Sequence, residues 1–286
     1  MEKLGDRHLN MRLNDSCMSV KEVMRLVTFL TDFGNKSVYV AQMKGVLYSL
    51  VSPVKCVDIS HDIAPQNVRE GAFILRAASR YFPRGTVHVA VVDPGVGTDR
   101  RGIVVVTKNQ IFVGPDNGLL IPAAQSQGEY IAYEISNPTL LRRPLSRTFH
   151  GRDIFTPIAA QILNGLPFDQ IGPRVETVID LSFSKPSFVE DTIFGAVLFI
   201  DGFGNIITNI HYDDVHDKIK NGQTLTVQIG SKRIQLAVVQ TYGMAEKDEL
   251  IALFGSSGYL EISKNQGTAD AYLQVKIGGV VQVRVN

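Results

Sequence analysis

The chain contains little cysteine, no tryptophan and almost no net charge. Its two cysteines, Cys17 and Cys56, are too few for a disulfide framework and lack the CxxC spacing of structural zinc sites. We therefore expect a protein of a reducing compartment, the cytoplasm. The 29 Lys and Arg residues nearly balance the 28 Asp and Glu residues and leave a formal charge of +1. This balance argues against nucleic-acid and membrane partners, because both attract proteins with an excess of basic residues.

Long apolar runs and cofactor motifs are also missing. No run approaches the ~18 apolar residues that span a bilayer. Residues 1–25 are polar and lack the apolar core of a secretory signal, so we expect a poorly ordered extension there. Neither HxH nor HExxH spacing occurs, and we expect no metal site. The absence of GxGxxG and GxxxxGK[ST] argues against a Rossmann dinucleotide loop and a P-loop.

The composition that remains is that of a folded protein, with 44% hydrophobic and 20% charged residues. Apolar runs and helical spacing alternate along the first part of the chain, which is typical of an α/β domain with a central, mostly parallel sheet over 26–186. Asn67 and Glu70 stand at capping-box spacing before one expected helix. The expected strands are 26–32, 54–60, 86–93, 102–107, 110–115 and 130–135, the fourth and fifth forming a hairpin, and the expected helices are 37–50, 67–81 and 153–164.

The pattern changes after about Pro186. Short alternating runs such as LTVQI, YLQVKI and VVQVRV follow one another with Gly, Asn and Asp between them. Helical spacing nearly vanishes apart from 212–220. We expect an all-β second domain over 187–286, a sandwich or a barrel, with the boundary in the polar stretch 184–190.

Two of the expected strands end in aspartate. Asp32 ends the first strand in TDFG, and Asp93 ends the third in DPGVG. Ligands of open parallel sheets bind at the carboxyl ends of the strands. A lone aspartate at such a place usually caps a turn, but two at equivalent strand ends, each followed by glycines, favour a site. Gly95 and Gly97 would allow a tight turn or a close approach of the backbone to a ligand.

The sequence surroundings of the histidines point to different roles, either catalytic or structural. His150 lies in the glycine-flanked motif FHGRD, where a catalytic and a structural role are about equally supported. Asp153 in the same motif is predicted to be the N-cap of the following helix. His61 follows a strand and fits a turn better than catalysis. His211 and His216 lie in a polar segment and are expected at the surface.

The segment DGFGNIITNI at 201–210 is the densest cluster of polar, glycine and aromatic residues in the second domain. It is either a β-turn that enters a strand or a site. As a site it offers a carboxylate, an amide and an aromatic ring within five residues, which would suit a purine or an amino acid. TYG at 241–243 and GSSGY at 255–259 have a similar character.

Taken together, these motifs resemble the S-adenosyl-L-methionine hydroxide adenosyltransferase family, which is related to the enzymes that make 5′-fluoro- and 5′-chloroadenosine. The resemblance implies an α/β domain followed by a β-barrel-like domain. It also implies a homotrimer with intersubunit sites and hydrolysis of S-adenosyl-L-methionine to adenosine and methionine without a cofactor. The motifs that carry it are TDFG (31–34), VAQMKG (40–45), DISHDIAPQNVREGA (58–72), VVDPGVGTDRR (91–101), GPDNGLL (114–120), FHGRD (149–153), DGFGNIITNI (201–210) and NQG (265–267).

The resemblance also implies roles for single residues. The family's Asp–Arg–His triad, to which activation of the water is ascribed, falls on Asp93, Arg100 and His150. The substrate-holding positions fall on Asp32 for ribose, Tyr242 for stacking on adenine, Phe203 and Asn205 for further adenine contacts, Asp201 for the methionine amine and Ser256 for the methionine carboxylate.

Two positions near the methionine end depart from the family pattern. Ser37 replaces a usual acidic residue, and Ser257 stands where the halogenating relatives carry a basic one. Both departures affect how the methionine part of the substrate would be bound.

The chemistry agrees with a sequence that lacks metal-ligand spacing, because attack at C5′ of a sulfonium expels a neutral thioether without an acid or a metal. We expect neutral His150 to act as base, Asp93 to orient its ring, and Arg100 to keep Asp93 ionised and stabilise developing hydroxide. A halide adenosyltransferase is the alternative enzyme. The carboxylate of Asp93 would repel a halide, and Gly151 lacks the hydroxyl of a fluoride site. A non-catalytic adenosine or S-adenosylmethionine sensor would not need the triad.

Overall fold

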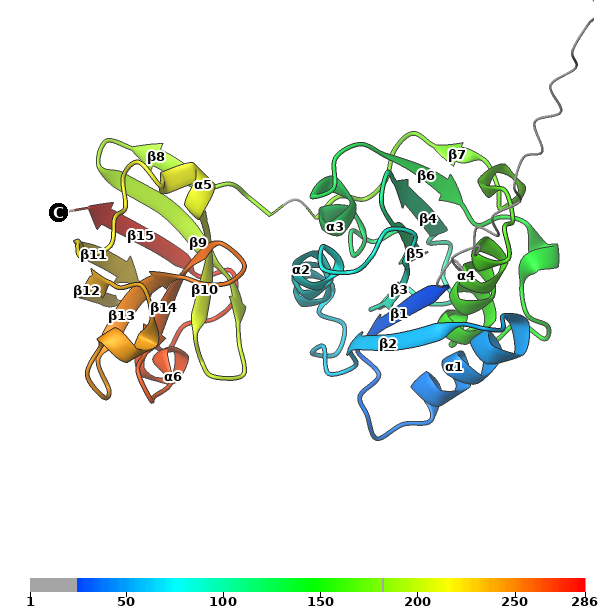
Figure 1. Cartoon of the computed structure of the whole chain (residues 1–286), viewed down its shortest axis with the longest axis horizontal. Coiled ribbons are helices and arrows are strands. Elements are labelled where there is room, and N and C mark those ends of the chain that lie inside the picture. Colours follow the sequence, from blue (N-terminus) through cyan, green and yellow to red (C-terminus); the bar gives the residue numbers. More distant parts are fainter. Residues whose placement is uncertain (1–24, 182, 286) are drawn as a thin grey trace, which may run out of the picture.

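The computed structural model describes residues 25–181 and 183–285 and folds them into two parts (Figure 1). The extension expected over 1–25 lies outside the described residues except for Arg25, whose carbonyl accepts the N–H of Lys55. The first part contains one sheet with helices on both faces, and the second is a barrel of strands. The predicted fold class is therefore confirmed.

The first sheet has the strand order β2-β1-β3-β5-β4-β6-β7. Its pairings from β2 to β5 are parallel, whereas those from β5 to β7 are antiparallel, because the β4–β5 hairpin reverses the chain. The sheet is thus more mixed than the sequence pattern indicated. Its strands are β1 (Leu26–Thr31), β2 (Lys55–Ser60), β3 (Val87–Val91), β4 (Gly102–Thr107), β5 (Ile111–Pro115), β6 (Tyr130–Glu134) and β7 (Arg174–Val175).

Helices cover both faces of this sheet. Helices α1 (Tyr39–Leu50) and α4 (Thr156–Leu163) pack against each other over one apolar cluster, and α2 (Val68–Ser79) and α3 (Ile121–Gln125) over the other. Asn67 is the N-cap of α2, because its side chain accepts the N–H of Glu70 at 3.1 Å. The reciprocal half of a capping box is absent, since the N–H of Asn67 bonds the Ala64 carbonyl, and Glu70 accepts the side-chain amide of Asn67 instead. In the described ranges, no helix has both the length and the apolar character needed to cross a membrane.

Short irregular helices complete the first domain and enter the second. A π-helical turn, Gly151–Phe155, leads directly into α4. Single 3₁₀ turns lie at Pro138–Leu140, Phe168–Gln170 and Tyr242–Met244.

The second part is a closed barrel of seven strands in the order β10-β14-β13-β12-β11-β15-β9, sealed by the β9–β10 pairing, with β8 added beside β9. Side chains alternate along its strands, so that Leu225, Val227 and Ile229 fill the interior. Its elements are β8 (Ser187–Val189), β9 (Thr192–Ile200), β10 (Ile206–His211), α5 (Tyr212–Val215), β11 (Thr224–Ile229), β12 (Lys232–Val238), β13 (Leu250–Phe254), β14 (Tyr259–Lys264), α6 (Ala269–Leu273) and β15 (Val280–Val285).

Helix α2 lies on the side of the first domain that faces the barrel (Figure 1). Phe73 of α2 stacks on Phe199 of β9 with ring centroids 5.1 Å apart. Together with Leu198, Ile207 and Tyr259, Phe73 forms a small buried apolar cluster between the two parts. This cluster removes apolar surface of both parts from water and so favours their contact.

Candidate active site

Asp32 and Asp93 follow neighbouring strands at the same edge of the first sheet, since Thr31 of β1 pairs in parallel register with Val91 of β3. The Oδ2 atom of Asp32 accepts the backbone N–H of Gln66 at 2.8 Å. This bond holds the carboxylate at the carboxyl end of the sheet, where ligands of such sheets bind.

Asp93, Arg100 and His150 are in direct contact. The Nε of Arg100 donates to both carboxylate oxygens of Asp93, at 2.9 and 3.2 Å, and its Nη2 also bonds Oδ2. The same Nη2 lies 2.8 Å from Nδ1 of His150. The side chains of Asp93 and Arg100 are only 5% and 12% exposed, so little water screens their interaction.

The order of this contact differs from the expectation that Asp93 would orient the imidazole. Arg100 stands between them, and a guanidinium has only N–H donors. Nδ1 of His150 must therefore accept, and the ring proton of neutral His150 belongs on Nε2. Burial, and then the charge of Arg100, lower the pKa of His150 against the opposing effect of Asp93. The lowered pKa favours the neutral ring, in which Nε2 carries the proton and is a hydrogen-bond donor.

The loop after β3 needs glycine to reach this arrangement. Gly97 has φ +78°, and a Cβ there would lie 2.4 Å from the carbonyl oxygen of Arg147. Only glycine allows the loop to lie so close to the segment that leads to His150.

Asp153 is not the N-cap of a helix, as the sequence pattern suggested. It lies inside the π-helical turn, fully buried. Arg152 Nε donates to it at 2.7 Å and the N–H of Ser146 at 2.9 Å. Burial alone would raise the pKa of Asp153, but these donors, Arg152 foremost, lower it. The carboxylate thus ties the 146–153 loop together around His150.

Replacing Asp153 tests this tie. Asp153→Ala leaves buried donors unpaired, and we expect the free energy of unfolding to fall by about 2 kcal/mol. Urea denaturation would measure it, with Asp169→Ala as control because Asp169 is exposed and unpaired in the described part of the chain. An unchanged midpoint for Asp153→Ala would contradict the structural role.

A pocket of about 900 Å³ opens on the barrel, and all the residues that line it lie between 201 and 268. It contains every barrel residue to which the resemblance assigned a substrate contact. Those residues are Asp201, Phe203, Asn205, Tyr242 and Ser256. None of Asp32, Asp93, Arg100 and His150 lines it.

Asp201 holds the turn that presents Phe203 to this pocket. Its Oδ1 accepts the N–H groups of Phe203 and Asn205, both at 2.9 Å, and its Oδ2 accepts the side-chain amide of Asn205 at 2.9 Å. Three hydrogen bonds thus hold the turn, while Phe203 remains 78% exposed.

Glu261 also lines the pocket, and the sequence analysis missed it. It is only 8% exposed and accepts the hydroxyl of Tyr242 at 2.8 Å. Burial raises the pKa of Glu261, and burial together with Glu261 raises the pKa of Tyr242 to about 12. A Cβ at Gly255 would lie 1.7 Å from Glu261 Oε1, so a glycine is required beside this carboxylate. In the motif YLEIS the glutamate resembles an ordinary solvent-facing strand residue, and only the chain packed over it reveals its burial.

The two serines that depart from the family pattern lie apart. Ser37 donates its hydroxyl to the Phe33 carbonyl at 3.1 Å in its own turn. Ser257 lines a crevice between the domains, whereas its neighbour Ser256 lines the barrel pocket.

The remaining histidines have other surroundings. His61 is buried, with Nδ1 2.9 Å from Thr31 Oγ1 and Nε2 3.1 Å from Asp58 Oδ1, which supports a structural role. His216 is exposed as expected, but His211 is only partly exposed and lines the crevice between the domains. Among the described residues, no group of three or more His, Cys, Asp and Glu side chains could hold a metal ion.

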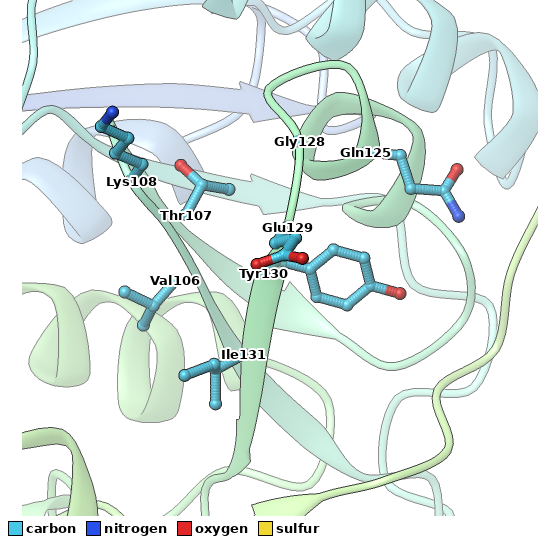
Figure 2. Close-up of a pocket in the computed structure, with 8 residues that line it drawn as sticks. All are labelled: Val106, Thr107, Lys108, Gln125, Gly128, Glu129, Tyr130 and Ile131. Atoms are coloured by element: carbon cyan, nitrogen blue, oxygen red, sulfur yellow. The ribbon is translucent and has the colours of Figure 1, made fainter.

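Another hollow of about 900 Å³ lies beside β4 and β6, where Figure 2 shows Lys108, Glu129 and Tyr130. Val87 of β3 pairs with Ile111 of β5, so this hollow is at the amino ends of the parallel strands, opposite Asp93. None of the predicted site residues lines it. Its position and its lining give it no part in the candidate site.

Comparison with known proteins gives consistent matches over both parts. Residues 27–172 match the family model described as the SAM hydroxide adenosyltransferase N-terminal domain, and residues 195–282 match the C-terminal domain model. The (R)-S-adenosyl-L-methionine hydrolase of Methanocaldococcus jannaschii is 37% identical over 264 residues, which cover 89% of this chain and 94% of the relative. A crystal structure of an uncharacterized conserved protein from Thermotoga maritima superimposes with a TM-score of 0.86 at 39% identity, covering 90% of this chain and 99% of that one.

Halogenating relatives are more distant. The fluorinase of Nocardia brasiliensis is 29% identical over 291 residues, covering 91% of this chain and 97% of the relative. The chain is thus more similar to the hydrolase than to this fluorinase.

Proposed function

The chain belongs to the SAM hydroxide adenosyltransferase family, and we propose that it hydrolyses S-adenosyl-L-methionine to adenosine and L-methionine. The observation that carries the proposal is the contact of Asp93, Arg100 and His150 at the carboxyl edge of the first sheet. A protein that only senses the substrate would not need this buried charged set.

The substrate would be held by two surfaces. Asp32 would bind the ribose hydroxyls beside the reacting carbon. The barrel pocket would take adenine between Phe203 and Tyr242, with the methionine end towards Ser256. Because adenine has a π-face, such aromatic contacts contribute ~1–3 kcal/mol each.

These two surfaces would come from neighbouring chains. Within one chain, residues 201–268 line the barrel pocket without help from the first domain, and the catalytic residues lie outside it. This separation of the two sets of residues supports a site that a second copy completes. We propose the homotrimer that the family resemblance implies, in which the barrel pocket of one subunit closes over the Asp93–Arg100–His150 set of the next; a head-to-tail contact of this kind can close as a ring.

The reaction is a displacement at the ribose C5′. The water oxygen forms a bond to C5′ as the C5′–S bond breaks, and the electron pair leaves on sulfur as the neutral thioether of methionine. The proton of the attacking water passes to solvent. As the attacking water loses its proton and gains hydroxide character, its negative charge and the positive charge of the sulfonium neutralise each other, so a poorly hydrated site favours the step.

Arg100 and His150 would act on the attacking oxygen. We assign the Nε2–H of His150 as a donor to it, since Nδ1 is occupied by Arg100. The guanidinium adds positive charge that stabilises developing hydroxide. Asp93 keeps Arg100 in place, because its carboxylate accepts two hydrogen bonds from the Nε of Arg100.

A halide is a weaker candidate for the nucleophile. Asp93 places a carboxylate beside Arg100 that would repel chloride or fluoride. Gly151 offers no hydroxyl, and a Cβ there would lie 3.1 Å from Met43 Sδ, so the turn is packed for glycine.

Product analysis tests the function. The protein is incubated with S-adenosyl-L-methionine, with and without chloride, fluoride or a chelator, and the nucleosides are separated by chromatography. We expect adenosine and methionine in every case. Products in the presence of the chelator would fit an enzyme without a metal cofactor, and we propose that this enzyme is cytoplasmic. A 5′-haloadenosine product would support the halide reaction instead, and no product would support a sensor.

The pH dependence tests the role of His150. Protonation would place a hydrogen on Nδ1 against the N–H of Arg100 and break their contact. Because the pKa of His150 is lowered, we expect kcat to remain constant down to the ordinary histidine value of ~6.5 and to fall only at lower pH. A rate that already halves above pH 7 would contradict this role.

A further inference from the structure

A crevice of about 250 Å³ between α2 and the barrel has a lining rich in hydrogen-bond donors. Arg76 comes from α2 and Arg80 is the C-cap residue that follows it, whereas His211, Ser257 and Tyr259 come from the barrel. No carboxylate lines it. Two acidic groups interact with the lining from outside it. The 82% exposed carboxylate of Asp213 lies 3.4 Å from His211 Nδ1, and the charge of Asp214 acts on Tyr259.

The two arginines have no carboxylate partner within residues 25–181 and 183–285. Aromatic rings hold them in place instead, because the guanidinium carbon of Arg76 lies 5.7 Å from the ring centre of Tyr259, and that of Arg80 lies 5.0 Å from the ring of Tyr81. Two uncompensated guanidinium groups that line one crevice repel each other, and an anion between them would relieve that repulsion.

His211 adds a donor of defined tautomer. Its Nδ1 accepts the N–H of Asp213 at 3.3 Å, so the proton of the neutral ring is on Nε2. The Nε2 lies against the Gly258 backbone, where a Cβ would be only 2.5 Å away. The barrel side of the crevice is thus lined by the His211 ring and by Ser257, both of which have a hydrogen-bond donor.

We propose that this crevice binds a small oxyanion of the phosphate class, such as inorganic phosphate or pyrophosphate. Such an anion offers only acceptors, which match the guanidinium, imidazole and hydroxyl donors, and arginine forks bind phosphate oxygens in pairs. The volume suits a small anion that enters without a nucleoside.

The site is joined to the barrel pocket by one hydrogen bond. Arg80 Nη2 donates to the carbonyl of Ser256 at 3.1 Å, and Ser256 lines the pocket that the proposed function assigns to the substrate. An anion that recruits Arg80 would release this carbonyl. If the proposed function holds, KM for S-adenosyl-L-methionine should then rise about threefold, the effect of one hydrogen bond.

Calorimetric titration of the full chain with pyrophosphate and with phosphate, at constant ionic strength, tests binding without any substrate. We expect one site per chain. Arg76→Gln and Arg80→Gln should each bind the anion at least about tenfold more weakly than the parent, which is the effect of losing one charged hydrogen bond. Arg69→Gln is the matched control, because Arg69 is an exposed α2 arginine that does not line the crevice.

Three results would overturn the proposal. These are the absence of binding heat, equal loss of affinity in Arg69→Gln, and loss of affinity in Phe203→Ala, which would locate the anion in the barrel pocket. Thermal unfolding shows whether each variant is folded. Pyrophosphate should raise the Tm of the parent and of Arg69→Gln, but not that of Arg76→Gln or Arg80→Gln. These measurements need no turnover, so the two proposals can fail separately. A protein without hydrolase activity would not contradict the anion site, and a protein that binds no anion would not contradict the hydrolase function.

Discussion

Arg100→Met is expected to lower kcat by ~10²–10³-fold while changing KM little. Methionine keeps much of the length of the side chain but removes the charge and the donors that join Asp93 to His150. The lost interaction stabilises the attacking oxygen rather than bound substrate, so the effect belongs to the transition state. Steady-state release of adenosine would measure both constants.

The acid limb of the pH profile should move as well. Removing Arg100 takes away one of the causes that lower the pKa of His150 and leaves the opposing effect of Asp93. The pKa of His150 therefore rises, and the rate of Arg100→Met should begin to fall at a higher pH than that of the parent. Arg100→Lys keeps the charge without the fork and should lie between the two.

Single and double variants of the set provide the control. Asp93→Ala and His150→Ala should each lower kcat, and the double variant should lose much less than the product of the two factors, because residues that act as one unit are not additive. Asp32→Ala should weaken substrate binding, with a smaller loss of rate. If Arg100→Met retains kcat within threefold of the parent, the assigned role of Arg100 is wrong.

Mixing two inactive variants should restore activity, and this is the second large expected effect. His150→Ala disables the first-domain surface, and the double variant Phe203→Ala/Tyr242→Ala disables the barrel pocket. Removal of two aromatic contacts to adenine, at ~1–3 kcal/mol each, should lower kcat/KM by at least about thirtyfold. If neighbouring subunits share each site, random mixing of equal amounts leaves both surfaces intact at about one quarter of the sites.

The experiment uses co-expressed variants that carry different tags and are purified through both. Purification through both tags removes the homotrimers, and each remaining trimer has one intact site in three, so recovered activity near a third of the parent's supports shared sites. The matched control joins all three substitutions in one chain and co-expresses it with His150→Ala; every site then lacks His150 and should be inactive. Activity of the first mixture that stays at the level of its components would show that each chain completes its own site, which would remove the argument for the trimer.

Features that depend on neighbours in the chain could be predicted from the sequence alone. The order of strands and helices follows from apolar spacing, because period 2 and period 3.6 are properties of short segments. The cap at Asn67 needs only a residue three positions later. The common edge of Asp32 and Asp93 follows because the carboxyl ends of parallel strands meet at one edge.

Tertiary structure decided which groups touch and which are buried. Arg100 meets His150 across 50 positions, and this contact, which no spacing reveals, decides the tautomer of the ring. Glu261 has the alternation of an exposed strand residue, yet the chain at Gly255 and Tyr242 covers it. Asp153 precedes a helix but is buried in a π-turn. Burial and hydrogen-bond partners depend on segments distant in sequence, and the balance of desolvation and charge that sets a pKa exists only after those segments have packed.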